Sequence, residues 1–346
     1  MSFFALPFDF RKIIKPLVFI LYFLLVIVVG LRYQVGGDWV SYHNKLINYQ
    51  YINTMQDFIE LAEPGYGLLN YLSVSLNITD IIWVNLICAI LFFTCFYKFS
   101  NYLNNLIFPL FICFTYTILV VATGYTRQSV AIGFSLLVFL SILEKNVFKY
   151  FLFIFLGLLF HKTIIVFLIF LPFLFNILNF ERSLNFIFYT IFSIVLVTVI
   201  VYLSIINEYN AYTAGMTSRG AYMRLIMHVL PIIIYLFNRN FFRSRLSQMN
   251  MAVLDLSICI IIYLFVLAIF MSTVADRINL YFVFFDIFVL TFIFNNLKLS
   301  KKLVLWFLIF ISNTIVLTLW LFFGKWTAED WLPYNNYLLI YLNSII

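Results

Sequence analysis

The feature that most constrains this chain is a series of long apolar runs separated by short polar connections. A run of about 20 apolar residues is long enough to cross the hydrocarbon core of a bilayer as an α-helix. Only 10% of the residues are charged, whereas a soluble domain has about 25% charged residues to cover its surface. The sequence therefore predicts an all-α fold, a polytopic transmembrane helical bundle.

The apolar runs predict about 11 to 12 spans. They lie at residues 13–31, 80–97, 106–122, 129–143, 150–160, 163–178, 186–206, 223–238, 250–271, 278–294 and 302–323. A single helix over 150–178 would place Lys162 in hydrocarbon, which costs about 2.5–3.5 kcal/mol. We therefore expect two short helices that meet at an external turn formed by His161, Lys162 and Thr163.

The distribution of positive charge predicts the orientation. With the N-terminus in the cytoplasm, most lysines and arginines fall on the cytoplasmic side, which is the usual positive-inside bias. These residues are Arg11, Lys12, Lys15, Lys98, Lys145, Lys149, Arg182, Arg239, Arg243, Arg245, Lys298, Lys301 and Lys302. We expect one integral membrane domain, 1–346, whose outer segments 32–79, 207–222 and 324–346 form periplasmic loops and short periplasmic helices.

Several function classes lack their sequence signals. The four cysteines lie inside apolar runs, where small buried hydrophobic residues are common. The three histidines form no HExxH-like cluster, so we expect no metal site. The chain has neither a P-loop nor a GxGxxG motif, so we expect no nucleotide-driven step and no cofactor. Because the excess positive charge is explained by topology, we expect no nucleic-acid partner.

The outer polar residues mix both charge types and gather at the ends of the predicted spans. Arginine at a membrane boundary is suited to phosphate, because its planar guanidinium can bond two oxygens at once. Carboxylates on the same side could accept a proton. This combination indicates phosphate-linked substrates that enter from the bilayer. The polar motifs are Arg32 to Asp38, Glu63-Pro64-Gly65-Tyr66, Arg127-Gln128, His161-Lys162, Arg219, Arg224, Asp276-Arg277 and Trp331 to Tyr334.

Each of these residues also has a structural interpretation. A boundary arginine can be a membrane anchor whose charged end reaches the interface. His161 can form a helix-end hydrogen bond, and Asp276-Arg277 can be a local ion pair. His228 is expected to bond a neighbouring helix. Asp255 and Asp286 can form a polar relay or hold helices together.

The motifs together resemble the EpsG-type proteins of bacterial polysaccharide clusters, which are related to Wzy-type O-antigen polymerases. The resemblance covers nearly the whole chain, although each motif is short. It begins with Arg32-Tyr-x-Val-Gly-x-Asp38-x-x-x-Tyr42. It continues through Glu63-Pro-Gly-Tyr66 with Leu68-Leu69-Asn70, Arg127-Gln-Ser-Val-Ala131, Leu159-Phe-His161-Lys-Thr163, Arg277 with Tyr281, and Trp331-x-Pro-Tyr334. Family members often have Ser where this chain has Lys162.

The resemblance implies a membrane glycosyltransferase that needs neither a metal nor a nucleotide sugar. Such a protein joins oligosaccharide repeat units on the periplasmic face of the bacterial inner membrane. Undecaprenyl pyrophosphate would carry both the growing glycan and the acceptor unit. A flippase and a chain-length regulator of the same pathway are expected partners.

The reaction implies roles for the outer residues. The leaving pyrophosphate needs positive charge, and the acceptor hydroxyl needs a base. We expect Arg32, Arg127, Arg219 and Arg277 to bind pyrophosphate. Asp38 or Glu63 would activate the acceptor, with His161 as the alternative base. Trp39, Tyr42, Tyr66 and Trp331 are candidates for stacking on sugars.

Three other activities remain open. A flippase of the lipid-linked unit would show pseudo-symmetric halves and a central charged cavity, and no internal repeat is evident. A membrane O-acyltransferase would need a histidine near the inner face, whereas His161 is predicted outside. An O-antigen ligase-like transferase uses chemistry too similar for the sequence to separate. The sequence identifies neither the sugars nor the linkage, and it does not separate O-antigen from capsule or exopolysaccharide.

Overall fold

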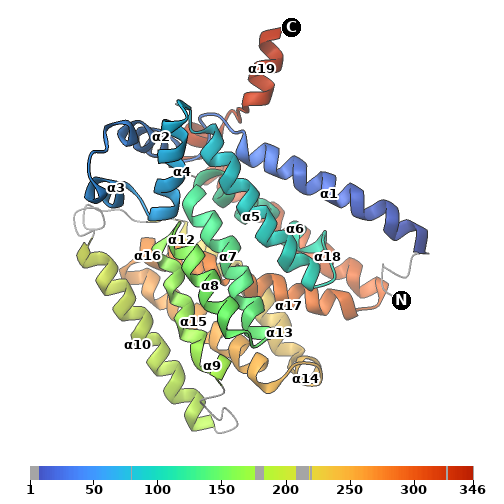
Figure 1. Ribbon diagram of the computed structural model, residues 1–346. Coiled ribbons are helices and arrows are strands. Elements are labelled where there is room, and N and C mark those ends of the chain that lie inside the picture. Colours follow the sequence, from blue (N-terminus) through green and yellow to red (C-terminus); the bar gives the residue numbers. More distant parts are fainter. Residues whose placement is uncertain are drawn as a thin grey trace. The chain divides into compact units, whose positions relative to one another are not determined.

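The computed structural model describes residues 8–78, 80–175, 183–207, 218, 220–324 and 326–345 (Figure 1). These residues form helices and connecting turns, and the only β-type pairing among them is an isolated bridge between Arg32 and Asn336. The all-α prediction is confirmed.

A helix or a pair of consecutive short helices lies at each predicted span. Within the described residues, five helical stretches are long and apolar enough to cross a membrane: Ile82–Tyr102 (α5), Thr126–Leu143 (α7), Gln248–Phe270 (α15), Ser272–Asn296 and Leu299–Phe323 (α18). The stretch 272–296 joins α16 (Ser272–Asn279), a short 3-10 turn and α17 (Val283–Asn296).

The other predicted spans also correspond to apolar helices or pairs of helices. They are α1 (Phe8–Gly30), α6 (Phe108–Cys113) with the π-helix Phe114–Ala122, α8 (Val147–Leu158), the 3-10 helix Lys162–Phe170 with α9 (Leu171–Phe175), α10 (Ser183–Asn207), and α12 (Ala221–Ile226) with α13 (Val229–Phe237). A five-residue helix, α14 (Arg239–Arg243), precedes α15.

The predicted break at His161 is present. Helix α8 ends at Leu158, and the next helical element begins at Lys162. The Lys162 side chain is exposed, so the chain avoids placing this lysine inside a continuous apolar helix. The backbone N–H of His161 donates to the Gly157 carbonyl (2.9 Å), which closes the end of α8.

The segment 32–79 contains the short helices expected of it. They are α2 (Trp39–Asn48), α3 (Met55–Leu61) and α4 (Pro64–Ser75). Thr54 and Asp57 form a capping box at the start of α3. Pro64 opens α4, where its missing N–H has no helical partner to lose. Gly36 has a φ of +105° and makes the turn before α2.

The chain divides into two compact units. The first contains residues 1–137, 155–162 and 291–346, and the second contains 138–154 and 163–290. In the first unit, α1 packs along α5, and a Cβ added at Gly30 would lie only 2.9 Å from the Leu86 Cα. Glycine therefore allows the two helices to approach closely. The prediction of one membrane domain stays a prediction.

Polar pairs join helices within the second unit. His228, at the start of α13, lies 2.8 Å from the Asp286 carboxylate of α17, as expected for a histidine bonded to a neighbouring helix. Arg239 donates to both Asp255 oxygens at 2.7 and 2.6 Å, and Tyr235 donates to Asp255 at 2.8 Å. Asp255 and Asp286 therefore have separate partners, which favours a helix-joining role over a shared relay.

The predicted orientation leads to a labelling experiment. A cysteine placed at exposed Gln56 in α3 should react with an impermeant thiol reagent in intact spheroplasts, and one at exposed Arg243 should not. Of the native cysteines, Cys88, Cys95 and Cys113 are buried and Cys259 is partly buried, so a cysteine-free background is needed. Labelling at position 243 without lysis would reverse the orientation.

Candidate functional site

Arg127 and Glu63 form an ion pair in the first unit. Arg127 lies in the first turn of α7, and Glu63 is the residue before α4. The Arg127 Nη1 donates to Glu63 Oε2 at 2.5 Å, and the two side chains are 21% and 18% exposed. Arg127, one of the predicted pyrophosphate ligands, and Glu63, one of the predicted bases, are therefore partners in this structure.

Two tyrosines surround the guanidinium of Arg127. Its Cζ lies 5.4 Å from the ring centre of Tyr42 and 5.8 Å from that of Tyr66, within the range of cation–π attraction. The Tyr42 hydroxyl donates to Asp38 Oδ2 at 3.0 Å. We refer to Asp38, Tyr42, Glu63, Tyr66 and Arg127 as the Arg127 cluster.

Both tyrosines of the cluster are donors rather than bases. Burial, followed by the charge of Asp38, raises the pKa of Tyr42 above its ordinary value. Burial also raises the pKa of Tyr66 well above its ordinary value. Both hydroxyls therefore stay protonated at neutral pH. Because Tyr42 bonds one oxygen of Asp38, it fixes the carboxylate, whose side chain is partly exposed.

Arg32 lies in the loop between α1 and α2 that also carries Asp38, and it is almost fully buried, at 1% exposure. Its guanidinium donates to the carbonyls of Val29 (2.8 Å) and Val35 (3.1 Å), and to the side chains of Asn85 (3.2 Å) and Thr126 (2.5 Å). These bonds join the end of α1, the loop before α2, α5 and the start of α7. The pyrophosphate role of Arg32 stays a prediction, and its bonds here support the loop that carries Asp38.

The C-terminal segment also holds this loop. The Gly36 N–H donates to the Asp330 carbonyl (2.6 Å), and the Tyr33 N–H donates to the Asn335 carbonyl (3.0 Å). Trp331 is buried and donates through Nε1 to Thr123 Oγ1 at 3.1 Å. Its ring lies so close to Gly124 that an added Cβ would overlap it. Residues of the tail and of the loop before α7 therefore fix the turn that precedes Asp38.

The segment that leads to His161 contacts the start of α4. The N–H groups of Gly65 and Tyr66 both donate to the Leu159 carbonyl, at 2.8 and 3.2 Å. A Cβ at Gly65 would lie 2.7 Å from the Leu159 Cβ, so glycine permits this contact. His161 follows two residues later and is 8% exposed. The structure thus joins the Glu63-Pro-Gly-Tyr66 and Leu159-Phe-His161 motifs.

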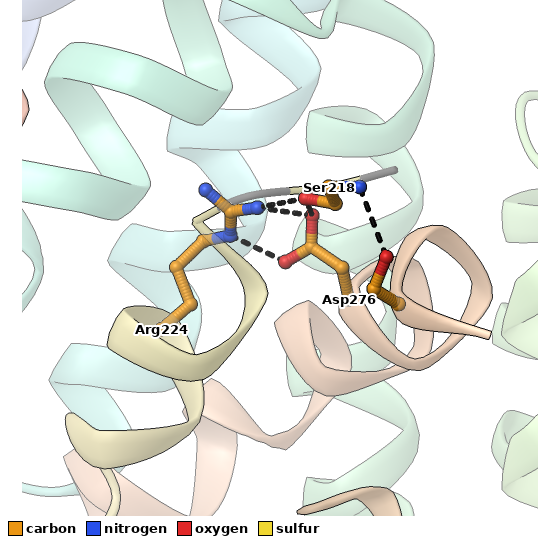
Figure 2. A network of polar contacts seen from close by, with 4 residues as sticks. Ser218, Arg224 and Asp276 are labelled. Atoms are coloured by element: carbon orange, nitrogen blue, oxygen red, sulfur yellow. Dashed lines mark hydrogen bonds and ion pairs between the residues drawn. The ribbon is translucent and has the colours of Figure 1, made fainter. Parts of the chain in front are cut away.

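The second unit contains a separate polar network (Figure 2). Arg224 of α12 donates through Nε and Nη2 to the two carboxylate oxygens of Asp276 in α16. Ser218 Oγ donates to Asp276 Oδ2 at 2.9 Å, and the Ser218 N–H donates to Ser272 Oγ at 3.0 Å. Asp276 therefore pairs with Arg224. The two residues are 52 positions apart, and the sequence does not suggest this pair.

The remaining predicted anion ligands are Arg219 and Arg277. Arg277 is partly buried in α16, next to Asp276. Arg219 lies outside the described residues. Among the described residues, no group of three or more His, Cys, Asp or Glu side chains is arranged to hold a metal ion.

A comparison with protein-family models shows which family the chain belongs to. Residues 15–336 match the model of the EpsG family. The chain belongs to the EpsG family. Searches of curated proteins and of solved structures found no match. Together with its apolar helices, the family makes the chain a multi-pass membrane protein with a polysaccharide polymerase-like function.

The EpsG motifs meet within each unit. In the first unit, the motifs containing Asp38, Glu63 and Arg127 form one cluster. In the second unit, Thr163 donates to the Tyr281 hydroxyl at 3.0 Å, which joins two other motifs of the resemblance. Resemblance alone identified these motifs, and the structure adds which of their side chains touch.

The four predicted sugar-stacking residues differ in exposure. Tyr42, Tyr66 and Trp331 are buried, at 2%, 0% and 7% exposure, so their rings are covered in this structure. Trp39 is partly exposed and stacks on His43 with 5.2 Å between ring centres. Sugar stacking stays a prediction for all four, and Trp39 keeps the most accessible ring.

Sequence reasoning did not include Asp330 or Ser218 among the site residues. Asp330 lies beside the Asp38 turn, with Oδ2 3.5 Å from a Cβ built on Gly37. Burial and the nearby charges of Glu329 and Asp38 raise the pKa of Asp330. The only sequence signal was its place next to Trp331 in the aromatic tail motif.

Proposed function

We propose that this EpsG-family protein is a repeat-unit polymerase of the bacterial inner membrane. It would transfer a growing glycan from undecaprenyl pyrophosphate to a lipid-linked acceptor unit on the periplasmic face. The observation that supports the proposal best is the Arg127 cluster. It holds an anion-binding guanidinium and an oriented carboxylate together at the start of an apolar helix.

The proposed reaction assigns one task to each group. A hydroxyl oxygen of the acceptor sugar attacks the anomeric carbon of the donor glycan and forms the new C–O bond. The bond between that carbon and the pyrophosphate oxygen breaks, and its electron pair leaves with the pyrophosphate. Asp38 takes the hydroxyl proton, while Arg127 stabilises the charge that develops on the leaving group.

Tyr42 supports the proposed base. Its hydroxyl bonds Asp38 Oδ2 at 3.0 Å, which leaves Oδ1 as the oxygen to accept the proton. A fixed carboxylate loses less conformational freedom when the acceptor binds, so less entropy is lost in reaching the reactive geometry. His161 and Glu63 remain the rival bases in this proposal.

Deleting the gene should leave surface glycan that carries a single repeat unit. This result is expected because flipping and attachment of one unit do not need polymerisation. The measurement is a gel of surface glycan, with the wild-type gene supplied on a plasmid as the control. Complete loss of the repeat unit would indicate a flippase, and full-length polymer retained on its lipid carrier would indicate a ligase.

A further inference from the structure

The Arg127 guanidinium is already neutralised in this structure. Glu63 occupies Nη1 at 2.5 Å, and both side chains are about four-fifths covered, with exposures of 21% and 18%. A partly buried ion pair of this kind is screened less by water than a surface pair. An incoming phosphate must therefore compete with Glu63 for the guanidinium.

Two donors beside this pair have no acceptor among the described residues. They are Arg127 Nε and the hydroxyl of Tyr66, whose side chain is 0% exposed. Buried polar atoms in native proteins are rarely left without a hydrogen bond, and exceptions often mark a functional site. The Arg127 Cζ lies 5.8 Å from the Tyr66 ring centre, so the two donors belong to one small region.

We infer that Arg127 and Tyr66 form the pyrophosphate subsite, and that Glu63 occupies it when substrate is absent. The inference rests on the proposed function. A carboxylate here uses Nη1. A pyrophosphate has several charged oxygens on two phosphates. One phosphate can take Nη1 and Nη2 in place of Glu63, while an oxygen of the other accepts from Nε and from the Tyr66 hydroxyl. Two-pronged binding of this kind suits the fixed geometry of a guanidinium.

The exchange of Glu63 for pyrophosphate at Arg127 also favours release of the product. After transfer, the site holds undecaprenyl pyrophosphate, which must leave before the next donor binds. Glu63 competes for the same guanidinium and so weakens product binding. Glu63 can weaken pyrophosphate binding only as far as it favours the empty subsite over the occupied one. Glu63 therefore lowers affinity for donor and product alike and keeps the subsite in turnover.

Purified full-length protein in detergent can be titrated with undecaprenyl pyrophosphate. Glu63→Gln removes the competing charge and should bind about tenfold more tightly than wild type, the size expected for one charge-assisted bond. Tyr66→Phe removes a donor and should bind severalfold more weakly. The matched control is Glu60→Gln, an exposed glutamate in α3, which should bind as wild type does.

The opposite shift would overturn the inference. If Glu63 only orients Arg127 for substrate, Glu63→Gln binds more weakly than wild type. Glu63→Asp guards against misfolding of the glutamine variant, because it keeps the charge but shortens the reach. It should also bind more tightly than wild type, and equal or weaker binding counts against exchange. Thermal melting and size-exclusion profiles report folding for every variant.

The outcomes separate the two proposals. Tighter binding by Glu63→Gln in a protein that never makes polymer would support the subsite and reject the polymerase. Polymer formation by wild type, with weaker binding by Glu63→Gln, would support the polymerase and reject the exchange. Inorganic pyrophosphate in a parallel titration tests whether the phosphates alone carry the difference.

Discussion

Asp38→Asn should lower polymer formation in vitro by roughly 10²–10⁴-fold, the usual contribution of a general base. Asparagine has nearly the same size, and its side-chain oxygen can still accept from Tyr42, which now lies 3.0 Å from the carboxylate. Asp38 makes no side-chain cap bond to α2, so the substitution removes no hydrogen bond from the start of the helix. The substitution therefore removes basicity while it preserves the local contacts.

The measurement is the rate of polymer formation from lipid-linked repeat units, with protein level checked by blot. Glu60→Gln is the matched control, because it removes an exposed carboxylate from α3 in the same segment. Normal polymerisation by Asp38→Asn together with an inactive His161→Ala would identify the histidine as the base. Wild-type rates in Asp38→Asn, Glu63→Gln and His161→Ala would mean that the proton leaves to water.

The helices were predictable because the signal for each is local. Every apolar run contains its own evidence, and the break at His161 follows from the cost of Lys162 in hydrocarbon. The starts of the short helices are local too. Pro64 opens α4, and Gly36 makes the turn before α2. These features depend on the residues at each position and their immediate neighbours.

The contacts of the candidate site were not predictable in the same way. Glu63 and Arg127 are 64 positions apart, and Thr123 and Trp331 are 208 apart. Such pairs depend on how each helix is rotated and packed, which apolar composition alone does not determine. Arg32 illustrates the difference, because a boundary arginine predicted to face phosphate is almost fully buried and donates to protein groups.

One contact of the site had a local signal. Asp38 and Tyr42 are four positions apart at the start of α2, and side chains with this spacing lie on the same face of a helix. Their hydrogen bond could therefore be expected as soon as a helix was predicted there. The bond gives Tyr42 a second proposed role, as a support for the proposed base, beside its predicted role in sugar stacking.

Arg127→Lys should fold and insert normally but lose most polymerisation, and Arg127→Ala should abolish it. Lysine keeps the charge and can still pair with Glu63. Its ammonium cannot present two donors in the fixed fork that phosphate oxygens fit. It also lacks the flat face that Arg127 places 5.4 Å from the Tyr42 ring centre and 5.8 Å from that of Tyr66.

The expected loss for Arg127→Lys is about ten- to a hundredfold, because one charge-assisted hydrogen bond contributes about 1.5–3 kcal/mol. The measurement is the length distribution of polymer on a gel, normalised to protein level. Arg243→Lys, at an exposed position in α14, is the matched control and should give the wild-type ladder. A membrane anchor would tolerate lysine, since either side chain reaches the interface. A full-length ladder from Arg127→Lys would therefore make Arg127 an anchor and leave Arg219 and Arg277 as the predicted pyrophosphate ligands.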